Sequence, residues 1–217
     1  MLETLSLGGR RVIDVGCGDG VWTRFMAAQG AVVTGVECSP RQLAKARAAA
    51  PVPGATIVEG VAEALPAGDG SADIVTFMNS LHHVPVAVHE RAMAEAARTL
   101  MPGGWLYAAE PVAEGTHFEA VRPIDDETAV RAQALVTLRS AERHGLVMER
   151  EVFYLHTVVH RDFETFRERI VSANAERERL FLDQDAAMRA LFARLARPCD
   201  GGYAFDQPMR VNLLARR

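Results

Sequence analysis

Short apolar runs alternate with amphipathic segments through the first half of the chain. The apolar runs have the length of buried strands, and the segments between them repeat their apolar positions at helical spacing. The predicted strands are Val12–Val15, Ala31–Glu37, Ala55–Glu59, Ser71–Met78 and Trp105–Ala109. The predicted helices are Val21–Ala28, Pro40–Ala48 and Pro85–Leu100. Strands that alternate with helices in this way predict an α/β fold with a parallel sheet.

The second half of the chain is richer in helical patterns. A loop is predicted over Val112–Pro123, and Leu146–Val159 reads as one long strand or a bent pair of strands. The other predicted elements are helices Asp125–His144, Arg161–Leu180 and Asp183–Ala196, and a last strand Tyr203–Ala215.

A glycine-rich turn joins the first predicted strand to the first helix. Gly16, Gly18 and Gly20 stand at alternate positions, directly after the strand that carries Asp14. Glycines at such a turn let backbone N–H groups approach a ligand closely. A tight turn without a ligand is the alternative interpretation. The dinucleotide fingerprint would need a further glycine at Val21, so a nicotinamide cofactor is disfavoured.

Glu37 ends the second predicted strand, about 20 residues after the glycine turn. A Rossmann-type fold presents a carboxylate at this place to the two ribose hydroxyls of a nucleotide. The spacing therefore predicts that Glu37 binds a ribose. A solvent-exposed strand end is the alternative.

Together, these residues resemble the first motifs of class I methyltransferases that use S-adenosylmethionine. The segment Gly60–Pro66 also resembles the family's loop Gly-Asp-Ala-Glu-x-Leu-Pro, although Val61 stands where the family has aspartate. The resemblance implies a Rossmann-like seven-stranded sheet, mostly parallel with an antiparallel last strand. It also implies helices on both faces and a helical insertion at about residues 161–197.

The same resemblance assigns the cofactor site. S-adenosylmethionine would be the methyl donor and S-adenosylhomocysteine the product. Cys38 would lie on the adenine face, Ala62 would keep a backbone contact to the adenine, and Asn79 would lie near the amino group of the cofactor. The residues expected to bind it are Asp14, Gly16, Cys17, Gly18, Gly20, Glu37, Cys38, Val61, Ala62 and Asn79.

Catalytic residues are less defined, because methyl transfer needs alignment more than a nucleophile. His82, His83 and Glu110 are weak candidates, since they follow predicted strands at the ligand edge. A surface salt bridge is the alternative for Glu110. Two adjacent histidines in a loop point in different directions, so we expect no metal site.

Composition and charge indicate the number of domains, the partners and the localisation to expect. The chain has 217 residues, 49% of them hydrophobic, a net charge of -4 and three cysteines. These values favour one domain, 1–217, with a cofactor-binding half 1–110 and a substrate-side half 111–217. The weak net charge gives no reason to expect nucleic acid. Scattered cysteines, no signal peptide and no membrane-spanning run indicate a cytoplasmic protein. A homodimer is left open as its assembly.

Three functions remain open at this point. The leading hypothesis is methyl transfer to a small-molecule acceptor by in-line displacement. A protein of the same fold that binds S-adenosylmethionine without catalysis is the second. An NAD-dependent oxidoreductase is the third and is disfavoured by the glycine spacing.

Overall fold

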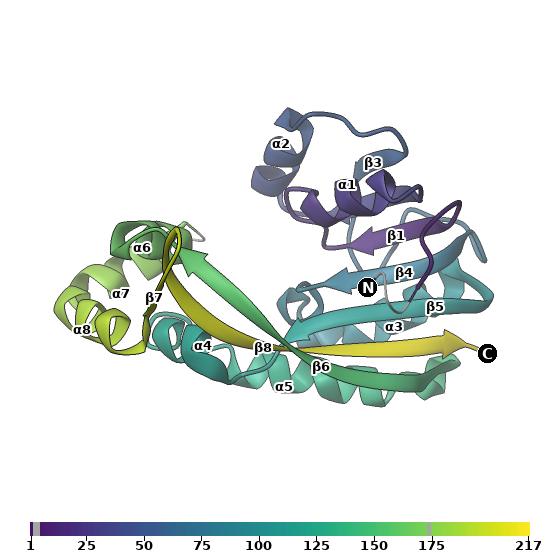
Figure 1. Cartoon of the computed structure of the whole chain (residues 1–217). Helices are drawn as coiled ribbons and strands as arrows, with labels where there is room; N and C mark the ends of the chain where they lie inside the picture. The colour runs from purple at the N-terminus through teal and green to yellow at the C-terminus, as the bar shows by residue number, and fades with distance from the viewer. Residues whose placement is uncertain (2–4, 173–174) are drawn as a thin grey trace. The chain divides into compact units, whose positions relative to one another are not determined.

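The sheet follows the order expected of an open α/β fold. The structure is a computed structural model that describes residues 1, 5–172 and 175–217 (Figure 1). Its strands run in the order β3-β2-β1-β4-β5-β8-β6, with β7 paired to β8 off this path. The strands are β1 (Arg11–Val15), β2 (Val32–Glu37), β3 (Ala55–Glu59), β4 (Ala72–Met78), β5 (Leu100–Pro111), β6 (Leu146–His160), β7 (Arg197–Cys199) and β8 (Gly202–Arg216).

Strands β1 to β5 pair in parallel, and β8 runs against β5 between β5 and β6 (Figure 1). The predicted Rossmann-like sheet of seven main strands with an antiparallel last strand is therefore confirmed, and the three-residue β7 is an addition. The parallel register aligns Val15 with Phe77, and Met78 with Ala109. All these carboxyl ends lie along one edge of the sheet.

Helices fill most of the connections between the strands. The α-helices are α1 (Val21–Ala28), α2 (Pro40–Ala48), α3 (His89–Thr99), α4 (Gly115–Val121), α5 (Thr128–Arg139), α6 (Phe163–Val171), α7 (Ala175–Asp183) and α8 (Asp185–Leu195). Short 3-10 turns are η1 (Leu81–His83), η2 (Val86–Val88) and η3 (Ala141–His144). In the described part of the chain, no helix combines the length and the apolar character needed to cross a membrane.

Alternating strand residues bury two separate layers of side chains, as the period of two in a strand requires. Ile13 and Val75 belong to one core, to which α3 and α5 add Met93 and Leu138. Val12 belongs to the other core, to which α1 adds Met26 and Ala27. Helices thus cover both faces of the parallel sheet, as predicted.

Three predictions of local structure were wrong. The segment predicted as the loop Val112–Pro123 contains α4, which buries Phe118 and Ala120. The helix predicted over Arg161–Leu180 is two helices, α6 and α7, because α6 already ends at the C-cap residue Ser172. The helix predicted over Asp125–His144 gives way to η3 after Arg139.

Contacts divide the chain into two compact units. The first comprises residues 1–110, 133–152 and 211–217, and the second comprises 111–132 and 153–210. The second unit has its own aromatic core, in which Phe166, Phe181, Phe192 and Phe205 are buried. Its three helices α6–α8 occupy the place predicted for the helical insertion. The single-domain organisation predicted from the sequence stays a prediction.

Candidate functional site

The glycine turn between β1 and α1 requires glycine for two different reasons. Gly16, Gly18 and Gly20 all have positive φ angles, of 67°, 59° and 78°, which L side chains rarely adopt. A Cβ atom at Gly16 would lie 2.7 Å from the Cβ atom of Ser80. A Cβ atom at Gly18 would meet no protein atom within 4 Å. Gly16 is therefore needed for packing, whereas the space beside Gly18 is open to a ligand.

Glu37 connects the glycine turn to the end of β2. Its Oε2 atom accepts a hydrogen bond from the N–H of Gly18 at 2.8 Å. Its Oε1 atom accepts from the N–H groups of Cys38 at 3.0 Å and Ser39 at 2.8 Å. The side chain is buried, so the alternative of a solvent-exposed strand end is wrong. Glu37 organises two loops at once, a role that sequence reasoning did not anticipate.

Asp14 lies beneath the turn and faces the interior of the first unit. Its two carboxylate oxygens accept hydrogen bonds from the hydroxyls of Thr23 at 2.7 Å and Thr76 at 2.9 Å. Burial raises the pKa of Asp14 to about 6, against the two hydrogen bonds, which lower it. These contacts join β1, α1 and β4, and the direct contact to a cofactor expected for Asp14 stays a prediction.

The two cysteines expected at the site differ in exposure. Cys17 is buried, with its Sγ atom 2.9 Å from the position that a Cβ atom at Gly35 would take. Burial raises the pKa of the Cys17 thiol to about 12, so the thiol stays protonated and unreactive at neutral pH. Cys38 is exposed directly after Glu37, and its contact with an adenine stays a prediction.

The loop around Val61 is held by two residues of α3. The carboxylate of Glu95 accepts from the N–H of Leu65 at 2.8 Å. The guanidinium of Arg98 donates to the carbonyls of Leu65 at 3.2 Å and Ala67 at 2.9 Å. Val61 is 39% exposed on this loop, whereas Ala62 is buried. Glu95 and Arg98 were missed by the sequence analysis, because nothing in their helical spacing links them to a loop 30 residues away.

Asn79 ends β4 in a conformation that is rare for residues other than glycine. Its φ angle is 59°, and its N–H donates to the carbonyl of Ala109 on β5 at 2.8 Å. The next residue, Ser80, donates from its hydroxyl to the carbonyl of Val15 at 2.6 Å. The ends of β1, β4 and β5 are thereby fixed to one another beside the glycine turn.

Glu110 stabilises the turn η1 that carries the two candidate histidines. Its Oε1 atom accepts from the N–H groups of Ser80 at 3.1 Å and Leu81 at 2.8 Å. Its Oε2 atom makes a short contact with Nδ1 of His82. Glu110 is 1% exposed, so the alternative of a surface salt bridge is wrong.

His82 and His83 are adjacent but occupy different environments. His82 is 4% exposed, whereas His83 is exposed. Their rings are tilted against each other with centroids 4.0 Å apart. The contact with Glu110 fixes the orientation of the buried ring, in the way that a carboxylate orients an imidazole in many active sites.

All the predicted site residues from Asp14 to Glu110 lie within the first unit, at the carboxyl edge of β1 to β5. This edge is where open α/β sheets bind nucleotides. Glu37 has accepted three N–H groups, and a carboxylate offers about four lone-pair positions. The Oε2 atom, which accepts from the N–H of Gly18, therefore lies next to the open space at Gly18.

Comparisons with known proteins agree with this geometry. Residues 13–108 match the family described as "Methyltransferase domain". A ubiquinone biosynthesis O-methyltransferase of Paraburkholderia xenovorans is 35% identical over 167 residues, which are 65% of this chain and 69% of that protein. An uncharacterised methyltransferase of Synechocystis is 39% identical over 104 residues, and the chain spans about half of its length, 48%.

The fold is also found in solved structures. The crystal structure of BH2331 from Bacillus halodurans C-125 covers 96% of this chain and 93% of its own, with a TM-score of 0.64 and 22% sequence identity. At that identity the likeness concerns the fold alone.

Proposed function

The chain belongs to the methyltransferases that use S-adenosylmethionine, and we propose that it transfers the methyl group to a hydroxyl oxygen of a small-molecule acceptor. The observation that carries the proposal is the pairing of Glu37 with the glycine turn at 2.8 Å, beside the open space at Gly18. The choice of oxygen rests on the P. xenovorans relative, which is named an O-methyltransferase.

The first unit would hold the cofactor mainly through groups that are already in place. Glu37 would accept from the ribose, and the turn from Gly16 to Gly20 would bring its backbone alongside the amino-acid part. The bound cofactor supplies a methyl group on a sulfonium cation. The protein then has to align the acceptor, exclude water and receive one proton.

An acceptor hydroxyl must lose its proton during methylation, so a general base is useful. His82 is buried and held by Glu110, which suits a residue that positions the turn. His83 is the exposed imidazole of the pair. We therefore assign the positioning role to His82 and Glu110, and the role of general base to His83.

The decisive experiment measures release of S-adenosylhomocysteine with a panel of hydroxylated aromatic acceptors, beginning with catechol. Methyl transfer that depends on the acceptor supports the proposal. Binding of S-adenosylhomocysteine without transfer to any acceptor would instead indicate a non-catalytic binding protein. Binding of NAD in preference to S-adenosylhomocysteine would contradict the family assignment of the site.

Two variants separate the roles of the histidines. His83→Asn should lower kcat while the affinity for S-adenosylhomocysteine and the melting temperature stay unchanged. His82→Asn should lower the melting temperature, because it removes a buried partner of Glu110. A His83→Asn enzyme with full kcat at every pH between 6 and 9 would mean that the base is another group.

A further inference from the structure

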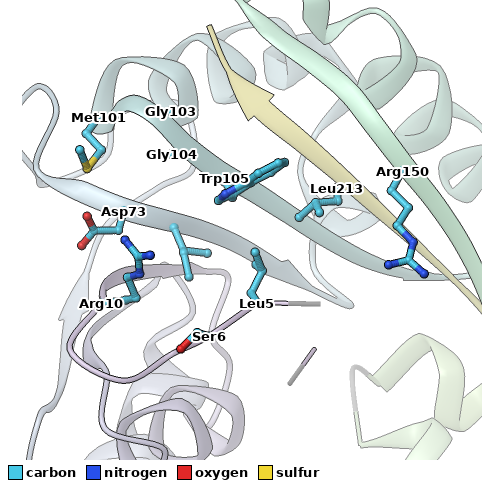
Figure 2. A pocket seen from close by; sticks show the side chains of 11 residues that line it. Leu5, Ser6, Arg10, Asp73, Met101, Gly103, Gly104, Trp105, Arg150 and Leu213 are labelled. Carbon is cyan, nitrogen blue, oxygen red and sulfur yellow. The ribbon is translucent and has the colours of Figure 1, made fainter. Parts of the chain in front are cut away.

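A pocket lies at the edge of the sheet opposite to the glycine turn, because the parallel strands that border it begin there. It sits at the beginnings of β4 and β5 and next to β8 (Figure 2), entirely within the first unit. Its volume is about 390 Å³, which is within the range of small-molecule sites. The site proposed for the cofactor is at the other ends of the same strands, so this pocket plays no part in it.

The pocket has an apolar wall built from neighbouring strands. Ile74 on β4 pairs in register with Trp105 on β5, and Leu213 on β8 completes the wall with Leu5. Trp105 is only half-buried, whereas Ile74 and Leu213 are buried beneath the surface. An indole ring that borders a pocket favours flat aromatic ligands, which stack on it with little loss of conformational entropy.

Two arginines give the pocket a positive charge. Figure 2 shows Trp105 and Leu213 between Arg10 on one side and Arg150 on the other. Both arginines are exposed, and neither forms a salt bridge with any residue in the described ranges 5–172 and 175–217. Guanidinium groups in such positions are suited to bidentate binding of carboxylates.

The acidic residue of the pocket, Asp73, is paired with a third arginine, Arg11. The carboxylate of Asp73 accepts from the backbone N–H of Arg11 at 2.8 Å and from its guanidinium at 3.0 and 3.2 Å. These contacts, together with the charge of Arg10, hold the pKa of Asp73 below its usual value, and Arg11 offsets the charge of the carboxylate. The two remaining cationic side chains therefore determine which ligands the pocket attracts.

We propose that this pocket binds a small aromatic carboxylate, and a dicarboxylate in preference, with the ring on Trp105 and Leu213 and the carboxylates at Arg10 and Arg150. The site is independent of the proposed methyl transfer, because no residue of the pocket belongs to the cofactor edge. It would take an organic anion that is neither the methyl donor nor the acceptor.

The test uses three probes of the same shape and different charge: terephthalate, benzoate and the neutral benzamide. In a Trp22→Phe background Trp105 is the only tryptophan, so its fluorescence reports on this pocket. We expect saturable binding of terephthalate with a dissociation constant on the order of 1 mM, weaker binding of benzoate and the weakest binding of benzamide. Calorimetry provides a second measurement if the fluorescence does not respond.

Variants of the exposed arginines complete the test. Arg10→Gln and Arg150→Gln should each weaken terephthalate binding about threefold to fivefold, as expected for exposed ion pairs. Arg91→Gln, at an exposed position on α3, is the matched control and should change nothing. Saturating S-adenosylhomocysteine should not displace terephthalate. Equal binding of terephthalate and benzamide, unchanged affinity in both pocket variants, or displacement by S-adenosylhomocysteine would each overturn the proposal.

Discussion

Glu37 shows how one side chain can prepare a site before the ligand arrives. Its carboxylate holds Gly18 on one side and Cys38 and Ser39 on the other, so a ribose would meet an acceptor that is already oriented. Preorganised acceptors of this kind reduce the entropic cost of binding. The same contacts imply that changing Glu37 will affect both the empty protein and its complex.

We expect Glu37→Gln to weaken binding of S-adenosylhomocysteine by about tenfold to a hundredfold, because charge-assisted hydrogen bonds contribute roughly 1.5–3 kcal/mol each. Calorimetric titration measures this directly. Glu59→Gln is the matched control, since Glu59 is the register partner of Glu37 on β3 and is exposed. If Glu37→Gln and Glu59→Gln bind equally well, the ribose is held by other residues.

Asp14 should make the stability of the first unit depend on pH. Its pKa is raised from 3.8 to about 6 in the folded protein, so the folded state binds more protons than the unfolded state between these values. The stabilising contribution is therefore complete below about pH 4 and is lost as the pH rises to about 6. Above that, the folded protein keeps a buried carboxylate to which Thr23 and Thr76 donate hydrogen bonds.

Asp14→Asn removes this titration. The stability of the variant relative to wild type should rise by a few kcal/mol between pH 4 and pH 7, as measured by urea unfolding at several pH values. Thr23→Val serves as a comparison, because losing one hydroxyl donor should raise the pKa of Asp14 further. A constant difference between Asp14→Asn and wild type across this range would show that the pKa of Asp14 is unshifted.

At the level of elements, glycine has two different roles in the turn between β1 and α1: Gly16 allows close packing, and Gly18 leaves space for a ligand. Gly16 and Gly18 both have positive φ angles, in the left-handed region that is strained for other residues. Alanine at either position should therefore lower the free energy of unfolding by about the same amount through backbone strain, roughly 1–2 kcal/mol. Only Gly16 abuts another residue, Ser80 on the neighbouring loop. The difference between the two variants therefore measures packing alone.

Gly16→Ala should lower the free energy of unfolding by about 3 kcal/mol or more, because overpacking adds to the backbone strain. Gly18→Ala should cost less stability but weaken S-adenosylhomocysteine binding, since its methyl group would enter the open space beside Glu37. Unfolding curves and titrations of the two variants give the comparison. Similar losses of stability in both would contradict the packing role of Gly16.

The elements that the sequence predicts well are those whose structure is determined by residues close together in the sequence. The β1–α1 turn, the strand that ends at Glu37 and the helices α1 and α2 follow from apolar runs, glycine spacing and an N-cap serine. The helix α4 was missed because it has only seven residues and begins at a glycine. A helix that short shows barely two turns of apolar spacing, which resembles a loop.

The contacts of the site that escaped prediction join segments that are distant in the sequence. Glu110 reaches η1, and Glu95 reaches Leu65, each across 29 or 30 residues. Nothing in the residue type distinguishes the buried Glu110 and the half-buried Glu95 from surface acids on a helix or at a strand end. Only the parallel register of β4 and β5 brings Glu110 to the turn after Asn79.

At the scale of the whole molecule, each unit carries titratable side chains whose pKa is shifted by burial: an acid in the first unit and two histidines in the second. The first has Asp14, and the second has His117 and His160, whose rings are stacked with centroids 5.7 Å apart. Burial, together with the positive charge of nearby Arg169, lowers the pKa of both histidines to about 4. Over the same pH range, Asp14 and the histidines therefore change the stability in opposite directions.

The two histidines stabilise the folded protein most at neutral pH, because their pKa is lower in the folded than in the unfolded state. The unfolded chain protonates at about pH 6.5 and the folded protein only at about 4, so the contribution of the neutral rings is complete above pH 6.5 and is lost as the pH falls toward 4. His160 is buried among Phe166 and Phe205, and its Nε2 atom has no hydrogen-bond partner among the described residues. A phenyl ring at position 160 would leave no polar atom without a partner between Phe166 and Phe205.

The free energy of unfolding should fall between pH 7 and pH 4.5 in both wild type and His160→Phe. We expect the fall to be about 1–3 kcal/mol smaller in His160→Phe than in wild type. The variant should also be at least as stable as wild type at pH 7, since it removes a buried polar atom without a partner. His156→Phe is the matched control, because His156 lies on the same strand β6 but is exposed. Urea unfolding at the two pH values measures both effects. If His160→Phe and His156→Phe show the same pH dependence, His160 does not titrate with a depressed pKa, and the acid sensitivity of the protein arises elsewhere.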